Sequence, residues 1–256
     1  MKNSDIRRER PPRKSSFLKR IFVFLVVIVM IAGAGAAAGF FVSVSKHLPD
    51  VTANIQPNAS SRIYDDKGRL ITTVHAEENR IPVPITEVPQ NLQNAFVAAE
   101  DVRFYEHHGI DPRGILRAVW NNVLSRNATG QGGSTITQQL ARNAFLTQEQ
   151  TLKRKLLEVV LALQIENKYT KKQILEMYMN QIYFGQGCYG IQTASRVYFG
   201  KDVKDLTLPQ CAMLAGLPNS PNYYSPFRSL EAAKYRQGIV LDQMAKYGYI
   251  SEADAQ

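Results

Sequence analysis

The chain has 256 residues, of which 45% are hydrophobic and 21% are charged, and its formal net charge is +9. This length is enough for one sizeable domain with an appendage. Residues 1–20 contain eight Lys or Arg and two Asp or Glu, so this basic arm carries +6 of the net charge. A nucleic-acid-binding domain needs basic residues along its folded surface, and the sequence therefore gives no case for a nucleic-acid partner.

Residues 21–45 follow the basic arm and contain no charged side chain. About 20 consecutive apolar residues can span a bilayer, and a basic segment before them favours a cytoplasmic N-terminus. The sequence therefore predicts a single-pass transmembrane anchor at 21–45, with everything after Lys46 outside the cytoplasm. The alternative is a cleaved signal peptide, because Ala36–Ala38 fits a small-residue cleavage pattern. The length of the apolar run favours the retained anchor.

The rest of the chain divides into a stalk with a small β element at 46–88 and a mostly helical domain at 89–256. A turn at Asp66–Gly68 between β-branched runs predicts a hairpin over 61–74. From Gln90 onward the apolar residues recur at helical spacing, so the fold class is mainly α. The predicted helical segments are 93–101, 113–124, 135–146, 150–166, 171–183 and 208–217. Cys188 and Cys211 are expected to be unpaired, since two cysteines make no disulfide framework.

Two adjacent acids, Glu100 and Asp101, follow the apolar run Phe96–Ala99. A general base needs a carboxylate whose pKa is raised by burial or by a like charge, and the apolar run gives Glu100 one apolar side. From the spacing alone, a helix cap or a salt bridge is an equal alternative for either acid. His107 and His108 have no third His or Cys at ligand spacing, so structural hydrogen bonding is the better interpretation for both.

A second polar group opens a later helix. Gly132–Thr135 is typical of a flexible lead-in followed by an N-cap. A helix that starts here places four side chains on one face, namely Thr135, Gln139, Arg142 and Asn143. A polar face with a cation near a helix N-terminus suits a phosphate. The alternative is a solvated face, which would more often carry Glu and Lys.

Two further groups lie downstream. The spacing of Arg154, Lys155 and Glu158 lets the three side chains converge. On spacing alone, an ordinary surface salt bridge worth under about 1 kcal/mol is the better interpretation. Glu176 and Asn180 share one face of the following helix. The run Gly185–Gly190 resembles GxGxxG but follows a helix instead of a strand, so a dinucleotide site fails its context test.

Taken together, these groups resemble the motifs of the family 51 peptidoglycan glycosyltransferases of bacterial cell-wall synthesis, in family order and spacing. The resemblance covers 61–256. The matching residues are Glu100–Asp101, Phe104, His107, Gly109, Gly133–Thr135, Thr137, Gln139, Asn143, Arg154–Lys155, Glu158, Ile174–Glu176, Tyr178, Asn180, Tyr183–Gly185 and Ala215–Pro221. Arg142 departs from the usual Lys, which keeps the charge but replaces a point charge with a planar fork.

The resemblance implies a lysozyme-like glycosyltransferase domain with a membrane-embedded jaw around 112–130. It implies polymerisation of lipid II into β-1,4-linked glycan strands, with inversion at the donor anomeric carbon and release of undecaprenyl pyrophosphate. Glu100 is then the general base, and Glu158 is the second acid that positions the cations or a metal. The implied substrate-binding residues are Asp101, Phe104, His107, Ser134, Thr135, Gln139, Arg142, Asn143, Arg154, Lys155, Glu176 and Asn180.

The resemblance also implies partners and a location. The partners are lipid II, the growing glycan strand, the membrane and cell-wall synthesis proteins, and the location is the bacterial cytoplasmic membrane. A divalent ion, Mg²⁺ or Mn²⁺, has Glu158 as its candidate ligand, and no organic cofactor is expected. The hairpin and Glu78–Arg80 resemble the start of bifunctional class A penicillin-binding proteins, so we expect a fragment that lacks the transpeptidase domain and binds no penicillin.

Two alternatives belong to other functional classes. One is a muramidase-type hydrolase or lytic enzyme of lysozyme-like fold, which would degrade polymerised glycan. The other is a non-catalytic, membrane-anchored glycan-binding scaffold, which would tolerate the loss of the Glu100 carboxylate.

Overall fold

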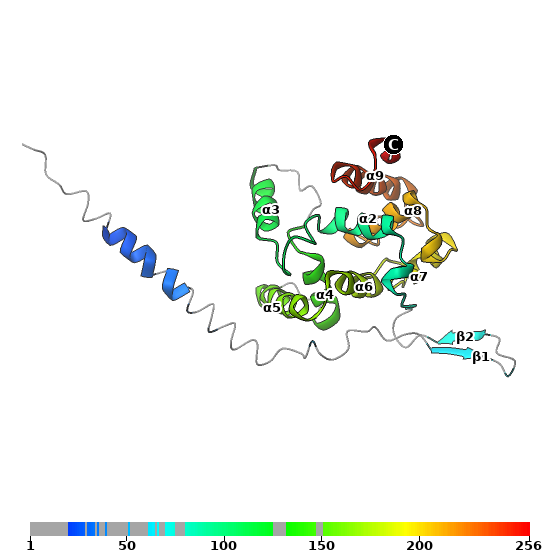
Figure 1. Ribbon diagram of the computed structural model, residues 1–256, viewed down its shortest axis with the longest axis horizontal. Helices are drawn as coiled ribbons and strands as arrows, with labels where there is room; N and C mark the ends of the chain where they lie inside the picture. Colours follow the sequence, from blue (N-terminus) through cyan, green and yellow to red (C-terminus); the bar gives the residue numbers. More distant parts are fainter. Residues whose placement is uncertain are drawn as a thin grey trace, which may run out of the picture. The chain divides into compact units, whose positions relative to one another are not determined.

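The computed structural model describes the following residues of the chain (Figure 1): 20–28, 30–33, 35, 39, 51, 61–64, 66, 70–74, 80–124, 132–146 and 151–256. The chain forms two compact units, Met1–Leu48 and Pro49–Gln256. In the first unit, residues 20–28 and 30–33 are helical and their side chains are exposed. Among the described residues, no helix has both the length and the apolar character that crossing a bilayer requires. The anchor at 21–45 lies partly outside the described residues and stays a prediction.

The second unit contains a small sheet and a larger set of helices. Strand β1 (Ser61–Tyr64) pairs antiparallel with β2 (Leu70–Val74), within the range where the sequence predicts a hairpin. The helical elements are η1 (Ile85–Glu87), α2 (Gln90–Glu100), α3 (Pro112–Leu124), α4 (Ile136–Phe145), α5 (Leu152–Lys168), α6 (Lys171–Gln181), α7 (Ile191–Phe199), η2 (Val203–Asp205), α8 (Leu208–Gly216), η3 (Leu217–Asn219), α9 (Leu230–Lys246) and α10 (Glu252–Ala255). The domain is therefore mainly helical, as the apolar periodicity predicts.

Helix α2 lies in the middle of the core. It packs against α8 and α9, as the ribbon shows, while α4 packs against α5 and α6 (Figure 1). Leu92 and the whole run Ala95–Ala99 are buried, which is typical of a helix that is covered on most of its sides. The Phe96 ring meets the Tyr178 ring edge-on, with 5.9 Å between centroids. This packing fixes the position of Glu100, the last residue of α2.

Helix α4 begins at a capping box. The Thr135 hydroxyl accepts a hydrogen bond from the Gln138 N–H at 3.1 Å, and the Gln138 side chain accepts one from the Thr135 N–H at 2.9 Å. The Asp101 carboxylate accepts a hydrogen bond from the Ile136 N–H at 3.0 Å. A negative charge at a helix N-terminus is favourable because the unpaired N–H groups and the helix dipole are positive there. The predicted N-cap is confirmed, and the C-terminal end of α2 is joined to the start of α4.

The extended segment before η1 is held by side chains of α6 instead of by a neighbouring strand. The Val83 N–H donates to Asn180 Oδ1 at 3.0 Å, and Asn180 Nδ2 donates to the Val83 carbonyl at 2.8 Å. The Ile85 N–H donates to Glu176 Oε2 at 2.7 Å. Glu176 and Asn180 therefore do share one face of α6, and that face binds the chain that leads into α2.

We expect Asn180→Ala to destabilise the fold, because it leaves the buried N–H and C=O of Val83 without their partner. Leaving buried polar groups unpaired should lower the free energy of unfolding by about 2–4 kcal/mol. Urea denaturation followed by circular dichroism measures the change. Asn94→Ala is the matched control, since its side chain accepts from Gln90 at an exposed site, and its effect should stay within about 0.5 kcal/mol. Equal losses in the two variants would contradict the structural role.

Candidate active site

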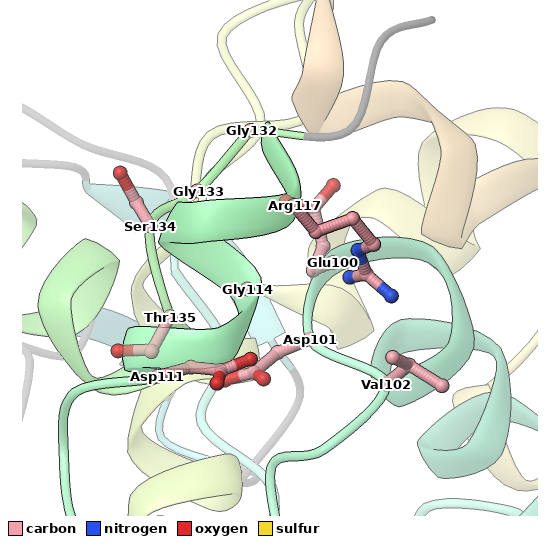
Figure 2. Close-up of a pocket in the computed structure, with 10 residues that line it drawn as sticks. All are labelled: Glu100, Asp101, Val102, Asp111, Gly114, Arg117, Gly132, Gly133, Ser134 and Thr135. Atoms are coloured by element: carbon pink, nitrogen blue, oxygen red, sulfur yellow. The ribbon is translucent and has the colours of Figure 1, made fainter. Parts of the chain in front are cut away.

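Glu100 lines a small hollow where the loop after α2 meets the start of α3 and the loop before α4. Figure 2 shows the ten lining residues, which are Glu100, Asp101, Val102, Asp111, Gly114, Arg117, Gly132, Gly133, Ser134 and Thr135. The volume of this hollow is about 20 Å³, which is room for roughly one water molecule. The hollow brings together the first and second polar groups that the sequence singled out.

The two oxygens of the Glu100 carboxylate have different surroundings. Oε2 accepts a hydrogen bond from Gln139 Nε2 at 2.9 Å. Gln139 is held in turn by the Tyr178 hydroxyl, which donates to Gln139 Oε1 at 3.2 Å. Oε1 of Glu100 is enclosed and has no hydrogen-bond partner among the described residues. One oxygen is therefore fixed, while the other remains available to accept a proton.

Burial raises the pKa of Glu100 above its usual value. The hydrogen bond from Gln139 and the positive charges of Arg236 and Arg142 lower that pKa, and the negative charge of Asp101 adds to the increase. The net direction is upward, because the loss of hydration outweighs the charges that favour the ionised form. A raised pKa brings a carboxylate closer to the pH at which a general base works best.

Asp101 and His107 are buried and bind each other. The His107 Nε2 atom lies 3.0 Å from both Asp101 carboxylate oxygens. Phe104 is fully buried, its ring meets the His107 ring edge-on, and the Lys171 ammonium lies 4.5 Å from the centroid of the Phe104 ring. Structural hydrogen bonding of His107 is thus observed, and the three residues tie the loop after α2 to its neighbours. Their direct contact with a substrate stays a prediction.

Arg154 and Lys155 converge on Glu158, as their spacing predicts. The Arg154 guanidinium bonds one Glu158 oxygen, and Lys155 Nζ donates to the other at 2.8 Å. Lys155 Nζ also donates to the Ser134 hydroxyl at 2.6 Å, which links the pair to the hollow. The interpretation of a surface salt bridge is wrong, because the Glu158 side chain is 0% exposed. A buried carboxylate with two cations leaves a net positive charge beside the hollow.

Glu158 does not fit the role of a ligand for Mg²⁺ or Mn²⁺. Each of its oxygens already accepts from a cation, so a divalent ion there would lie against two positive charges. Across the described part of the chain, no group of three or more His, Cys, Asp or Glu is arranged to hold a metal ion. Glu158 instead positions Arg154 and Lys155.

A larger groove of about 560 Å³ lies beyond Gln139. It is lined by Arg80, Gln139, Arg142, Asn143, Gln181, Ile182, Tyr183, Tyr189, Pro218 and Pro221. The Arg80 guanidinium lies 5.2 Å from the centroid of the Tyr189 ring, and the Tyr183 and Tyr189 rings are 4.9 Å apart. The groove thus combines cations with aromatic faces, at a size typical of a ligand site.

The residues of the predicted polar face of α4 have two different roles, lining the groove and capping the helix. Gln139, Arg142 and Asn143 line the groove, as predicted for one face. Thr135 instead caps the helix and donates to the Gly109 carbonyl at 2.7 Å. Glu176 and Asn180 bond the segment before η1, and their contact with a substrate stays a prediction.

Two residues near Glu100 were not identified from the sequence as site residues. Tyr178 is named above only as a match to the family motifs; its ring is buried in the core, and its hydroxyl donates to Gln139. Arg236 of α9 is buried, and its Nε donates to the Gly216 carbonyl at 3.4 Å. Arg236 lies at helical spacing between the buried residues Ala233 and Val240. A cation on an otherwise apolar helix face is the signal that would have found it.

Comparison with known proteins places the chain in a family. Residues 67–245 match the family model described as "Transglycosylase". Penicillin-binding protein 1A of Escherichia coli is 45% identical over 235 residues, which are 91% of this chain and 27% of the relative. Penicillin-binding protein 1F of Bacillus subtilis is 43% identical over 237 residues, or 93% and 33% of the two chains.

A solved structure was also matched. The crystal structure of penicillin-binding protein 1A from Haemophilus influenzae covers 78% of this chain and 20% of its own, with 27% sequence identity and a TM-score of 0.44. The chain spans about a third or less of the length of the curated relatives named above. The family model alone covers more than half of the chain. The chain therefore belongs to the transglycosylase family, the family 51 peptidoglycan glycosyltransferases.

Proposed function

We propose that this chain polymerises lipid II into β-1,4-linked glycan strands. The observation that carries the proposal is the asymmetric Glu100 carboxylate, which has one oxygen fixed by Gln139 and the other enclosed without a partner. The raised pKa of Glu100 and the neighbouring cations support it. A buried base beside a positive region suits a reaction between a hydroxyl and a pyrophosphate ester.

In the proposed reaction, Glu100 Oε1 takes the proton of the 4-hydroxyl on the GlcNAc of lipid II. The 4-hydroxyl oxygen of that GlcNAc then attacks the anomeric carbon at the end of the growing strand and forms the new C–O bond. The bond from that carbon to the pyrophosphate oxygen breaks, and its electron pair leaves with undecaprenyl pyrophosphate. Because attack and departure occur on opposite faces of the sugar, a single displacement inverts the anomeric carbon and gives the β link.

One carboxylate is enough for this chemistry. Pyrophosphate is a weakly basic leaving group, so it needs neutralisation of its charge more than it needs a proton. Arg142, Arg154 and Lys155 supply positive charge near the hollow and the groove, and Glu158 holds two of the three in place. No step requires a metal ion at Glu158.

The hydrolase alternative needs a second carboxylic acid, because a glycosidase must protonate an alkoxide leaving group. Asp101 is the nearest second acid in sequence, but its oxygens are bonded to His107 and to the Ile136 N–H. This arrangement favours the transferase. A scaffold without activity does not require the enclosed Glu100 carboxylate, whose raised pKa lowers the stability of the fold at neutral pH.

We extend the proposal to the location and the rest of the fold. The predicted anchor at 21–45 would place a lysozyme-like domain outside the bacterial cytoplasmic membrane, with cell-wall synthesis proteins as partners. The exposed side chains of Ile115 and Leu116 on α3 support a jaw in the membrane interface. The relatives are named penicillin-binding proteins, and the expectation that these 256 residues bind no penicillin stays a prediction.

We expect Glu100→Gln to abolish polymerisation, because the amide keeps the shape of the side chain but cannot accept the proton. The polymerisation rate should fall by about 10²–10⁴-fold. The measurement is polymerisation of lipid II in detergent, with products resolved by glycan length. Glu106→Gln, which changes an exposed acid in the same loop, is the control and should retain the wild-type rate. Long glycans from Glu100→Gln would refute the assignment of the base, and shortening of added glycan would favour the hydrolase.

The raised pKa of Glu100 makes a prediction about pH. The base works only when ionised, so kcat/KM should rise with pH through the pKa of Glu100 and level off above it. Because that pKa lies above the usual value of 4.5, the acid limb should also lie above pH 4.5. Initial rates of lipid II polymerisation in a constant-ionic-strength buffer series give the profile. A rate that is already maximal at pH 4.5 would contradict the pKa direction.

A further inference from the structure

We propose that Tyr178 is a positioning residue for the general base, acting through the amide of Gln139. The inference rests on the proposed function of Glu100. The Tyr178 side chain is fully buried on α6, and its hydroxyl donates to Gln139 Oε1 at 3.2 Å. Gln139 Nε2 then donates to Glu100 Oε2 at 2.9 Å. Three residues from three helices form one chain of hydrogen bonds that ends on the carboxylate.

The donors in this chain all point toward Glu100. A glutamine amide has an acceptor oxygen on one side and a donor NH₂ on the other, so an oxygen held by Tyr178 leaves the NH₂ facing the carboxylate. Successive hydrogen bonds polarise one another, which strengthens the donor that reaches the carboxylate. This series of hydrogen bonds therefore stabilises the ionised form of Glu100. It also holds Oε2, so that Oε1 is the oxygen left for the substrate proton.

The Tyr178 hydroxyl keeps its proton over the pH range in which Glu100 titrates. Burial and the negative charge of Glu100 raise the pKa of Tyr178 well above its usual range. The hydroxyl is thus a permanent donor and does not compete as a base. The Tyr178 ring has a separate role, because it packs edge-on against Phe96. A phenylalanine would keep that packing and lose only the hydroxyl.

Other charges also act on Glu100 and must be distinguished from the contribution of Tyr178. Arg142 of α4 and Arg236 of α9 favour its ionised form, and Asp101 disfavours it. Arg117 of α3 and Asp111 line the same hollow. None of these side chains is altered in Tyr178→Phe, so a change in the titration of Glu100 reports on the hydroxyl.

The test is Tyr178→Phe in the full chain, with the pKa of Glu100 measured by NMR of ¹³Cδ-labelled glutamate. The resonance that disappears in Glu100→Gln identifies Glu100. We expect the pKa of Glu100 to rise by roughly half to one unit. The acid limb of the polymerisation profile should shift by the same amount, while the rate on the alkaline plateau stays within roughly twofold.

Two controls separate this effect from a general loss of packing. Tyr198→Phe also removes a hydroxyl, one that donates to the Phe184 carbonyl at 2.8 Å, and it should leave the pKa of Glu100 unchanged. In a Gln139→Leu background, Tyr178→Phe should produce no additional shift, because the connecting amide is absent. An additional shift would show that Tyr178 does not act through Gln139.

The outcomes separate this inference from the proposed function. An unchanged pKa of Glu100 in Tyr178→Phe, or a rate lowered by one factor at every pH, would overturn the positioning role. If the pKa of Glu100 shifts in Tyr178→Phe but the wild-type chain makes no glycan, the positioning role is retained and the proposed function is rejected. If Tyr178→Phe does not fold, 3-fluorotyrosine at position 178 keeps the ring and strengthens the donor. The pKa of Glu100 should then fall, and no change would overturn the inference.

Discussion

The carboxylate of Asp101 is the interaction on which the geometry of the site depends. It lies directly after α2, binds His107 in the following loop and accepts the first N–H of α4. Through it, two helix ends of opposite polarity meet, and the loop that follows α2 is tied to the start of α4. Glu100 and Gln139 lie 39 positions apart in sequence, yet they are joined by a hydrogen bond because of this junction. Asp101 therefore has a structural role in the site, because it holds the end of α2 against the start of α4.

Two other acids, Glu158 and Glu100, show how different surroundings give the same functional group opposite properties. Glu158 is surrounded by Arg154 and Lys155, so its charge is paired and holds the cations in place. Glu100 has a neutral amide on one oxygen and nothing on the other, so burial dominates and its pKa is raised. Environment decides which acid is paired and structural and which has the raised pKa that suits the proposed base. The unpaired acid costs stability at neutral pH, because its unfolded form ionises at a lower pH than its folded form.

Local patterns in the sequence predicted the helices and a helix cap, but they did not predict the contacts between residues of different helices. The helical periodicity located α2, α3, α4, α5, α6 and α8, and the run Gly132–Thr135 was correctly interpreted as containing the N-cap of α4. Helices α7 and α9 lay within the predicted helical domain but were not delimited. The burial of Glu158 could not be predicted, since spacing along one helix does not show what covers it. Tyr178 and Arg236 come from α6 and α9. The apolar spacing around Arg236 indicates that it is buried, but no pattern within one helix shows which residue of another helix it faces.

The capping box at Thr135 has a consequence for two chemically identical neighbours, Gln138 and Gln139. Gln138 turns back to the Thr135 N–H, while Gln139 reaches Glu100 and Tyr178. Successive residues of an α-helix are separated by about 100° around its axis. The angular origin of α4 therefore decides which glutamine serves as a cap and which serves the base. A helix rotated by one residue would turn one of these two glutamines into the direction of the other, so the cap at Thr135 sets which glutamine faces Glu100.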